Sequence, residues 1–242
     1  MPKTKLPDKD FKWTPELAYT IGLITTDGNL SKNGRQIIMR SSDYRLLKTF
    51  KNCLNLANKS IIKRTFHNGW AKKPTYRIQI CNVQFYRWLL KIGLFPAKTY
   101  TIGKIKIPDK YFRDFLRGHL DGDGSISAYI DRYNSYQGRT YTNQRIFVRF
   151  TSASNNHINW LYRKINQNNG AKKGAFIYKP PATPNRVPMW DIKFAKKESI
   201  KLLKWIYYKK NLPCLKRKRV IAEKTIEKIS KEKRKKYTKI KI

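Results

Sequence analysis

The order of apolar and polar residues along the chain predicts short strands alternating with helices. Residues 76–80 (YRIQI) and 190–194 (WDIKF) alternate between apolar and polar side chains, which is typical of strands with one buried face. Residues 85–93 (FYRWLLKIG) and 199–208 (SIKLLKWIYY) read as amphipathic helices. Apolar residues recur at helical spacing in two further segments, at Leu47, Phe50 and Leu54 and at Ile158, Leu161 and Ile165.

The same order of elements occurs twice. When Asp27 is set against Asp123, each copy continues through two strands, a helix, two more strands and a helix. Both halves therefore read α-β-β-α-β-β-α, which predicts an α+β fold with pseudo-twofold symmetry. A proline-rich segment, residues 180–188, predicts a rigid extended loop within the last strand pair. The expected parts are an N-terminal half over residues 1–105, a C-terminal half over residues 106–222 and a basic tail over residues 223–242.

Each half begins with an apolar helix that ends at an acidic residue, Asp27 in the first half and Asp123 in the second. A glycine follows each acid, and we expect it to end the helix with a positive φ. Gly22 and Gly118 each begin a pair of small residues one turn apart, which lets another backbone approach closely. If these two helices pack on each other, the two acids lie side by side at the end of the pair.

Two neighbouring carboxylates repel each other unless a cation lies between them or one is protonated. Oxygen ligands of this kind suit Mg²⁺ or Mn²⁺, and such a metal can support hydrolysis of a phosphodiester. Taken alone, an Asp-Gly pair after an apolar run is most often a turn. The letters DGDGS also resemble a calcium-binding loop, but Ile126 and Arg132 stand where that loop requires Gly and Glu. Duplication in matching surroundings favours a functional site.

The strongly positive net charge of the chain indicates what kind of molecule it binds. The chain has 242 residues, and its 54 Lys and Arg against 15 Asp and Glu give a formal net charge of +39. Nucleic acid is the expected partner, ahead of an acidic protein, because each neutralised phosphate releases counterions. Aromatic residues make up 13% of the chain, which argues against a disordered basic polymer. No apolar run is long enough for a membrane span, so no membrane partner is expected.

Other residue types and the N-terminus add little chemistry. The three cysteines are far apart and lack CxxC spacing, so neither zinc nor a disulfide framework is expected. The three histidines, His67, His119 and His157, are separated in the sequence, and none is expected to be catalytic. The first residues lack the apolar stretch of a secretory signal. We therefore expect the protein in the compartment that holds its target DNA, a bacterial or archaeal cytoplasm or an organelle.

The two Asp-Gly helices carry a family resemblance. The segments IGLITTDG (residues 21–28) and LRGHLDGDG (residues 116–124) resemble the two motifs of a single-chain LAGLIDADG homing endonuclease, and the likeness extends over residues 14–220. The first motif departs from the pattern at Thr25, where an acid is common. The resemblance implies a pseudo-twofold monomer in which two curved antiparallel sheets straddle the major groove of double-stranded DNA. It also implies a double-strand break with short 3′ overhangs.

The resemblance assigns roles to residues of both motifs. It implies that Asp27 and Asp123 bind the catalytic divalent metals, Mg²⁺ or Mn²⁺, assisted by the carbonyls of Thr26 and Gly122. It also places a lysine near the active site late in each half. Lys98 in FPAKT and Lys216 in LPCLK match that place, although a phosphate or surface role is equally open for either lysine.

We expect the DNA bases to be recognised by side chains on the polar face of the strands. If Ile37, Met39, Ile78 and Ile80 face the core, alternation directs their neighbours toward DNA, and a slip of one residue would invert the set. The two halves differ at most of these positions, so we expect a target that is not a good palindrome. The residues expected to contact DNA are Asn29, Ser31, Gln36, Arg40, Arg77, Gln79, Ser125, Ser127, Tyr129, Arg149, Thr151 and Lys193.

Two alternatives to a nuclease remain open. One is an intron maturase, which would use the same fold to bind its host intron RNA. The other is a DNA-binding regulator that does not cleave. Retention of both Asp27 and Asp123 favours the nuclease, because binding alone does not need a repulsive acid pair.

Overall fold

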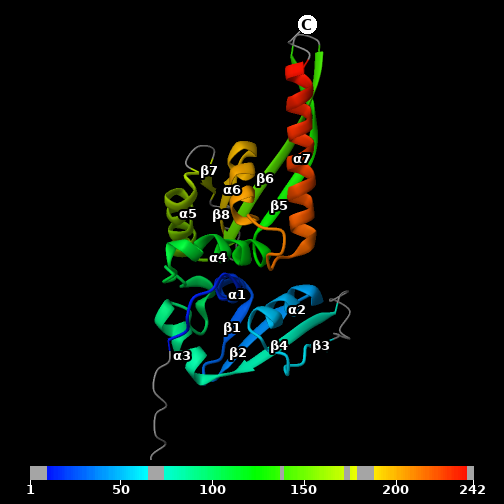
Figure 1. Cartoon of the computed structure of the whole chain (residues 1–242). Coiled ribbons are helices and arrows are strands. Elements are labelled where there is room, and N and C mark those ends of the chain that lie inside the picture. The colour runs from blue at the N-terminus through cyan, green and yellow to red at the C-terminus, as the bar shows by residue number, and fades with distance from the viewer. Residues whose placement is uncertain (1–9, 65–73, 137–138, 172–174, 179–187, 239–242) are drawn as a thin grey trace, which may run out of the picture.

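The structure is a computed structural model that describes residues 10–64, 74–136, 139–171, 175–178 and 188–238. The element order α-β-β-α-β-β-α occurs twice in it, which confirms the predicted α+β fold. Figure 1 shows one half above the other, with the first helix of each half, α1 and α4, lying between the two sheets. The proline-rich loop predicted at residues 180–188 lies, apart from Pro188, outside the described residues.

The first half is built around α1, which is buried along nearly its whole length. Thr14 caps the helix by accepting a hydrogen bond from the backbone N–H of Leu17 at 3.1 Å, and Pro15 suits the first turn. The elements of this half are α1 (Pro15–Thr26), β1 (Gly28–Leu30), β2 (Gln36–Ser41), α2 (Tyr44–Cys53), β3 (Ile62–Arg64), β4 (Thr75–Cys81), α3 (Val83–Ile92) and the one-turn 3-10 helix η1 (Lys98–Tyr100).

The second half repeats this order and adds one helix. The connection between the halves packs against the core, because Ile102, Ile105 and Ile107 are buried. The elements are α4 (Asp109–Asp121), β5 (Ser125–Tyr136), β6 (Arg139–Ser152), α5 (Asn155–Asn169), β7 (Ala175–Tyr178), β8 (Trp190–Phe194), α6 (Lys196–Ile206) and α7 (Lys216–Thr238).

Each half contains one antiparallel sheet of four strands, in the orders β1-β2-β4-β3 and β5-β6-β8-β7. One face of each sheet is apolar and forms the core with the helices. In the first sheet Met39 pairs with Ile78, in the second Phe150 pairs with Ile192, and all four side chains are buried. The opposite face carries polar side chains, as the alternation in the sequence predicts.

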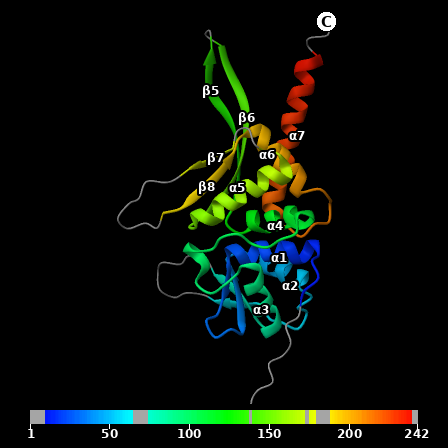
Figure 2. The same ribbon diagram turned by 90° about the vertical axis from the view of Figure 1, so that its left-hand side faces the viewer.

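The two halves meet where α1 and α4 cross, and the crossing depends on glycine. A Cβ atom on Gly22 would lie 2.2 Å from the carbonyl oxygen of Phe115, and one on Gly118 would lie 2.0 Å from that of Tyr19. No side chain fits at such distances, so the two backbones are in direct contact. Figure 2 shows the two helices side by side in the middle of the molecule.

The C-terminal helix differs from the expected tail. α7 continues from Lys216 to Thr238, past residue 222 where the basic tail was expected to begin. Ala222, Thr225 and Ile229 are buried at helical spacing, and α7 contacts β5 and β6. Residues 223–238 therefore belong to a helix that packs on the second half. The many lysines and arginines around this narrow apolar stripe obscure it in the sequence.

In the described part of the chain, no helix is both long and apolar enough to cross a lipid bilayer.

Candidate active site and nucleic-acid interface

Asp27 caps the C-terminal end of α1, whereas α4 ends at Asp121, earlier than predicted, and Asp123 lies two residues beyond that end. The backbone N–H of Asp27 donates to the carbonyl of Leu23 at 2.9 Å and so completes α1. A Cβ atom on Gly122 would lie 3.1 Å from Oδ2 of Asp27, so the backbone of the second motif lies against the carboxylate of the first. The close crossing of α1 and α4 therefore brings the two acids near each other.

The glycine after each acid has a different role from the one expected. Neither Gly28 nor Gly124 has a positive φ, so that prediction was wrong. A Cβ on Gly28 would lie 2.6 Å from Cα of Ile24, and one on Gly124 would lie 2.7 Å from Cα of Leu120. Both positions require glycine because the first strand folds back tightly against its motif helix.

The acids lie in surroundings that favour a bound cation. The pKa of Asp27 is raised to about 6, mainly by burial and also by the neighbouring charge of Asp123, while Lys218 and Lys98 oppose the shift. Burial also raises the pKa of Asp123, although the same two lysines oppose that shift. Ionisation of each carboxylate is therefore energetically unfavourable in these surroundings, and a cation bound next to the two acids would make it favourable.

Two buried lysines face the acids, one from each half. Lys98 in η1 donates to the carbonyl oxygen of Gly28, and Lys218 in the first turn of α7 donates to that of Gly124 at 2.7 Å. Lys218 also donates to the carbonyl of Leu120 at 2.6 Å, near the end of α4. The pKa of Lys98 and of Lys218 is lowered to about 8, because burial lowers it by more than the nearby carboxylates raise it. The two lysines occupy equivalent places in the two halves.

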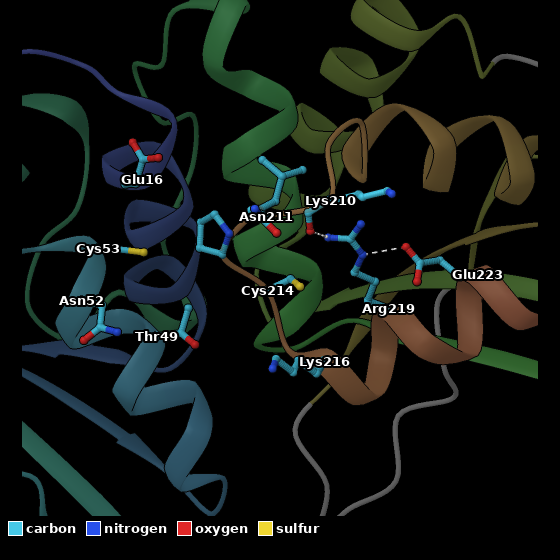
Figure 3. Close-up of a pocket in the computed structure, with 12 residues that line it drawn as sticks. Glu16, Thr49, Asn52, Cys53, Lys210, Asn211, Cys214, Lys216, Arg219 and Glu223 are labelled. Carbon is cyan, nitrogen blue, oxygen red and sulfur yellow. Dashed lines mark hydrogen bonds and ion pairs between the residues drawn. The ribbon is translucent and has the colours of Figure 1, made fainter.

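Lys216 does not lie at the place expected for an active-site lysine. It is exposed and lines a separate pocket of about 790 Å³ together with Cys214, Arg219 and Glu223 (Figure 3). Lys218 faces the acids instead. A signal for this exists in the sequence, because Leu215, Lys218 and Ala222 follow a spacing of three and four and are all buried.

The oxygen atoms at the helix ends fit a hard divalent cation. Asp27 and Asp123 supply two carboxylates, and glycine is required at position 122 because a Cβ there would lie 2.0 Å from Oγ1 of Thr26. Nowhere in the described residues do three or more His, Cys, Asp or Glu side chains gather into a possible metal site. Any further ligands must therefore be backbone oxygens, water or substrate, and the carbonyls of Thr26 and Gly122 stay a prediction in that role.

Two of the histidines, which are distant in the sequence, contact each other below the site. Nε2 of His119 lies 3.1 Å from Nε2 of His157, and Nδ1 of His157 lies 2.8 Å from the carbonyl oxygen of Gly103. Since Nδ1 of His157 must carry the proton for that bond, its Nε2 accepts a hydrogen bond from Nε2–H of His119, and both rings are neutral. Burial lowers the pKa of His157 to about 4 and that of His119 well below its usual value. Both rings line a pocket of about 290 Å³ with Lys98 and Asp123.

The residues expected to contact DNA from the first half lie on the polar side of its sheet. Asn29 and Arg40 are exposed, and Ser31, Gln36, Arg77 and Gln79 are partly exposed. Arg40 and Arg77 are directly opposite each other on β2 and β4, and the Arg77 guanidinium also donates to Gln79. Two facing arginines repel each other, so this position favours an anion such as a phosphate.

The second half presents a similar row, with an acid among its members. Ser125, Ser127, Tyr129 and Arg149 are exposed, whereas Thr151 and Lys193 are partly exposed. Thr151 donates to Asp191 at 2.8 Å, and Nη1 of Arg149 lies 3.3 Å from the same carboxylate. Lys193 lies over the ring of Phe147.

Two residues of this face were missed in the sequence analysis. Arg145 lies opposite Tyr129, and Phe147 lies opposite Ser127. The alternation of residues 145–149 (RIFVR) contains the signal, since Ile146 and Val148 are buried between them.

The chain was compared with known protein families and solved structures. Residues 14–92, about a third of the chain, match the LAGLIDADG-like domain. No curated protein matches the sequence. The I-LtrWI LAGLIDADG homing endonuclease bound to target DNA superposes with a TM-score of 0.57 at 15% identity, over 90% of this chain and 91% of that one. The LAGLIDADG meganuclease I-AabMI bound to uncleaved DNA gives 0.57 at 13% identity, over 92% of each chain.

A third similar structure is that of a protein whose name does not describe it as an endonuclease. Full-length DUF199/WhiA from Thermatoga maritima gives a TM-score of 0.53 at 13% identity over 91% of this chain, which spans 63% of the length of that protein. At these identities the likeness establishes the fold. This chain has the α+β fold of the LAGLIDADG homing endonucleases, and its residues 14–92 match a LAGLIDADG-like domain.

Proposed function

We propose that this protein is a single-chain, two-motif LAGLIDADG homing endonuclease that makes a metal-dependent double-strand break in DNA. The observation that carries the proposal is the doubled set of acid and lysine at the helix crossing. Asp27 and Asp123 lie near each other, and Lys98 and Lys218 face them from equivalent places in the two halves. A duplex has two strands, and this arrangement provides one acid and one lysine for each.

The chain's own residues would prepare the site for phosphodiester hydrolysis. Asp27 and Asp123 would hold Mg²⁺ or Mn²⁺, which supplies activation of water and neutralises charge on the phosphate. Lys98 and Lys218, with pKa values of about 8, carry a positive charge at neutral pH and would stabilise negative charge that develops on the phosphate. Gly22 and Gly118 would hold the acids together across the crossing.

The polar faces of the two sheets would bind the DNA. Their residues differ between the halves, so the proposed target is long and not palindromic, and the cut leaves short 3′ overhangs. Because both motifs lie in one chain, the proposed active form is a monomer. The net charge of +39 supports a partner of this kind, and binding should weaken steeply with salt.

The test uses a DNA fragment that joins the sequences flanking the gene's own insertion point. Purified protein is incubated with it in Mg²⁺, in Ca²⁺ and with a chelator, and the ends are mapped. We expect one double-strand break in Mg²⁺ alone, which Asp123→Asn abolishes while binding in Ca²⁺ survives. A matched control is Asp10→Asn, which alters an exposed acid outside both sheets and should leave cleavage in place.

Two results would contradict the proposal. If Asp123→Asn cuts at the wild-type rate, the acids are not the active site. Tight binding with no break under any condition would instead support a DNA-binding regulator, and binding of the host intron RNA would support a maturase.

A further inference from the structure

The first hairpins of the two halves differ greatly in length. β1 has 3 residues and β5 has 12, and each strand begins just after the acid of its motif. The first hairpin turns over residues 31–35, whereas the second continues until Tyr136 pairs with Arg139. With a rise of about 3.3 Å per residue, and less at the bulge between Asp131 and Asn134, the β5–β6 hairpin reaches about 25–30 Å farther from the acids.

The β5–β6 hairpin is joined to the rest of the second half by β8 and by α7. β8 pairs only with residues 148–152 of β6, so the outer part of the hairpin is a two-stranded ribbon, which is marginally stable in water by itself. α7 packs against both of its strands through a stripe that includes Ala222 and Ile229. Figures 1 and 2 show that α7 and the hairpin both extend away from the crossed helices, and Figure 2 shows that their outer ends lie apart.

Polar side chains follow one face of the hairpin from the acids as far as Asp131 and Asn143, with Phe147 among them. Exposed side chains alternate along β5 at Ser125, Ser127 and Tyr129, and Arg145 lies opposite Tyr129. Nη2 of Arg145 is held 3.0 Å from the carboxylate of Asp131, the next residue on this face, which fixes its direction. Asn143 lies opposite Asp131 and is partly exposed.

The composition of the outer segment is suited to reading bases. Residues 131–145 contain Arg, Asn, Gln, Tyr and Thr but no lysine, in a chain whose Lys and Arg total 54. Arg, Asn and Gln form paired hydrogen bonds with base edges, whereas lysine acts mainly as a point charge toward phosphate. A segment that only attracted DNA would use lysine, as the rest of the chain does.

We propose that the β5–β6 hairpin reads base pairs beyond the reach of the first half. The recognition site then extends farther from the cut on the side of the second half. The difference of about 25–30 Å corresponds to roughly seven to nine base pairs at 3.4 Å each. This inference rests on the proposed function for the position of the DNA, but it concerns recognition and not cleavage.

The first experiment maps the bound target by hydroxyl-radical footprinting in Ca²⁺, where no cleavage is needed. A variant with residues 131–143 replaced by Asn-Gly, which joins the paired residues Ile130 and Gln144, is mapped in parallel. We expect the variant to lose protection over several base pairs at one end only. Loss at neither end would overturn the inference, even if the protein cuts DNA. If protection is lost at one end but the protein makes no break in Mg²⁺, the inference about the hairpin stands and the proposed nuclease function is wrong.

A point variant guards against misfolding of the shortened hairpin. Asn143→Ala is compared with Asn29→Ala, which removes an exposed Asn on β1 close to the acids of the first half. Binding is measured on targets randomised at each base pair. We expect Asn143→Ala to reduce discrimination several-fold at an outer position of the long side and Asn29→Ala to act closer to the cut on the other side. Unchanged discrimination in Asn143→Ala at every outer position would overturn base reading by the hairpin.

Discussion

Nζ of Lys218 donates a hydrogen bond to the carbonyl oxygen of Gly124 at 2.7 Å, directly after the second motif acid. Lys98 makes the same contact with Gly28 in the first half. Since these contacts repeat about the helix crossing, the two lysines are the equivalent cations of the site. Lys216, only two residues away from Lys218, lies in a different pocket.

The first prediction concerns these lysines. Lys98→Met and Lys218→Met should each slow cleavage of the target by about 100-fold, because each removes a positive charge that would stabilise the phosphate site. Lys216→Met serves as the matched control and should cut at nearly the wild-type rate. Single-turnover cleavage in Mg²⁺ and binding in Ca²⁺ separate a loss of chemistry from a loss of affinity. If Lys216→Met and Lys218→Met slow cleavage equally, the position of Lys218 beside the acids does not explain its effect on cleavage.

The second prediction concerns the helix crossing. Gly118→Ala should lower the free energy of unfolding by about 1–3 kcal/mol, because its Cβ would lie 2.0 Å from a backbone oxygen of Tyr19 and must push the helices apart. Gly103→Ala is the control, since a Cβ there meets no atom within 4 Å. Denaturant unfolding measures both. A Gly118→Ala protein as stable as the control would mean that the helices do not touch at this position.

The third prediction concerns stability at the acid pair. Asp27→Asn should raise the free energy of unfolding in the absence of metal by about 1–2 kcal/mol, because it removes a partly buried charge that Asp123 repels. The same change should abolish the increase in melting temperature that Mg²⁺ gives the wild type. Asp10→Asn, which alters an exposed acid, should do neither. A lower melting temperature in Asp27→Asn would contradict repulsion between the acids.

The fourth prediction concerns pH and the pair His119 and His157. Their pKa values are lowered in the folded state, so the unfolded chain binds protons first as the pH falls below about 6.5. Stability from the neutral pair is therefore complete above that pH and decreases toward pH 4, by up to about 1.4 kcal/mol per pH unit for each histidine. The cations of Lys98 and Lys218 also act on the pair and oppose its protonation.

The measurement compares the wild type with His157→Gln, which retains hydrogen-bonding groups but does not titrate. This comparison is needed because Asp27 and Asp121, with pKa values of about 6, change stability in the opposite direction over the same range. The variant should lose less stability than the wild type between pH 6.5 and pH 4. Parallel curves for the two proteins would show that the histidines do not titrate on unfolding.

The sequence by itself determined the order of elements, the buried face of each sheet and the acids at the helix ends. These features depend on local periodicity and on comparison of one half with the other, both of which are visible along the chain. The pair Gly22 and Gly118 is visible for the same reason, because a small residue at a fixed place in an apolar helix already indicates a close crossing.

Only the tertiary structure decided which lysine faces the acids, which histidines meet and where the C-terminal helix packs. Lys216 and Lys218 are nearly indistinguishable in a run of basic residues. The direction of α7 buries Lys218 and leaves Lys216 exposed. His119 and His157 come from different helices, and their contact depends on how α5 lies against α4. Such contacts join residues distant in the chain, so their geometry is set by the packing of the whole core, which local patterns do not contain.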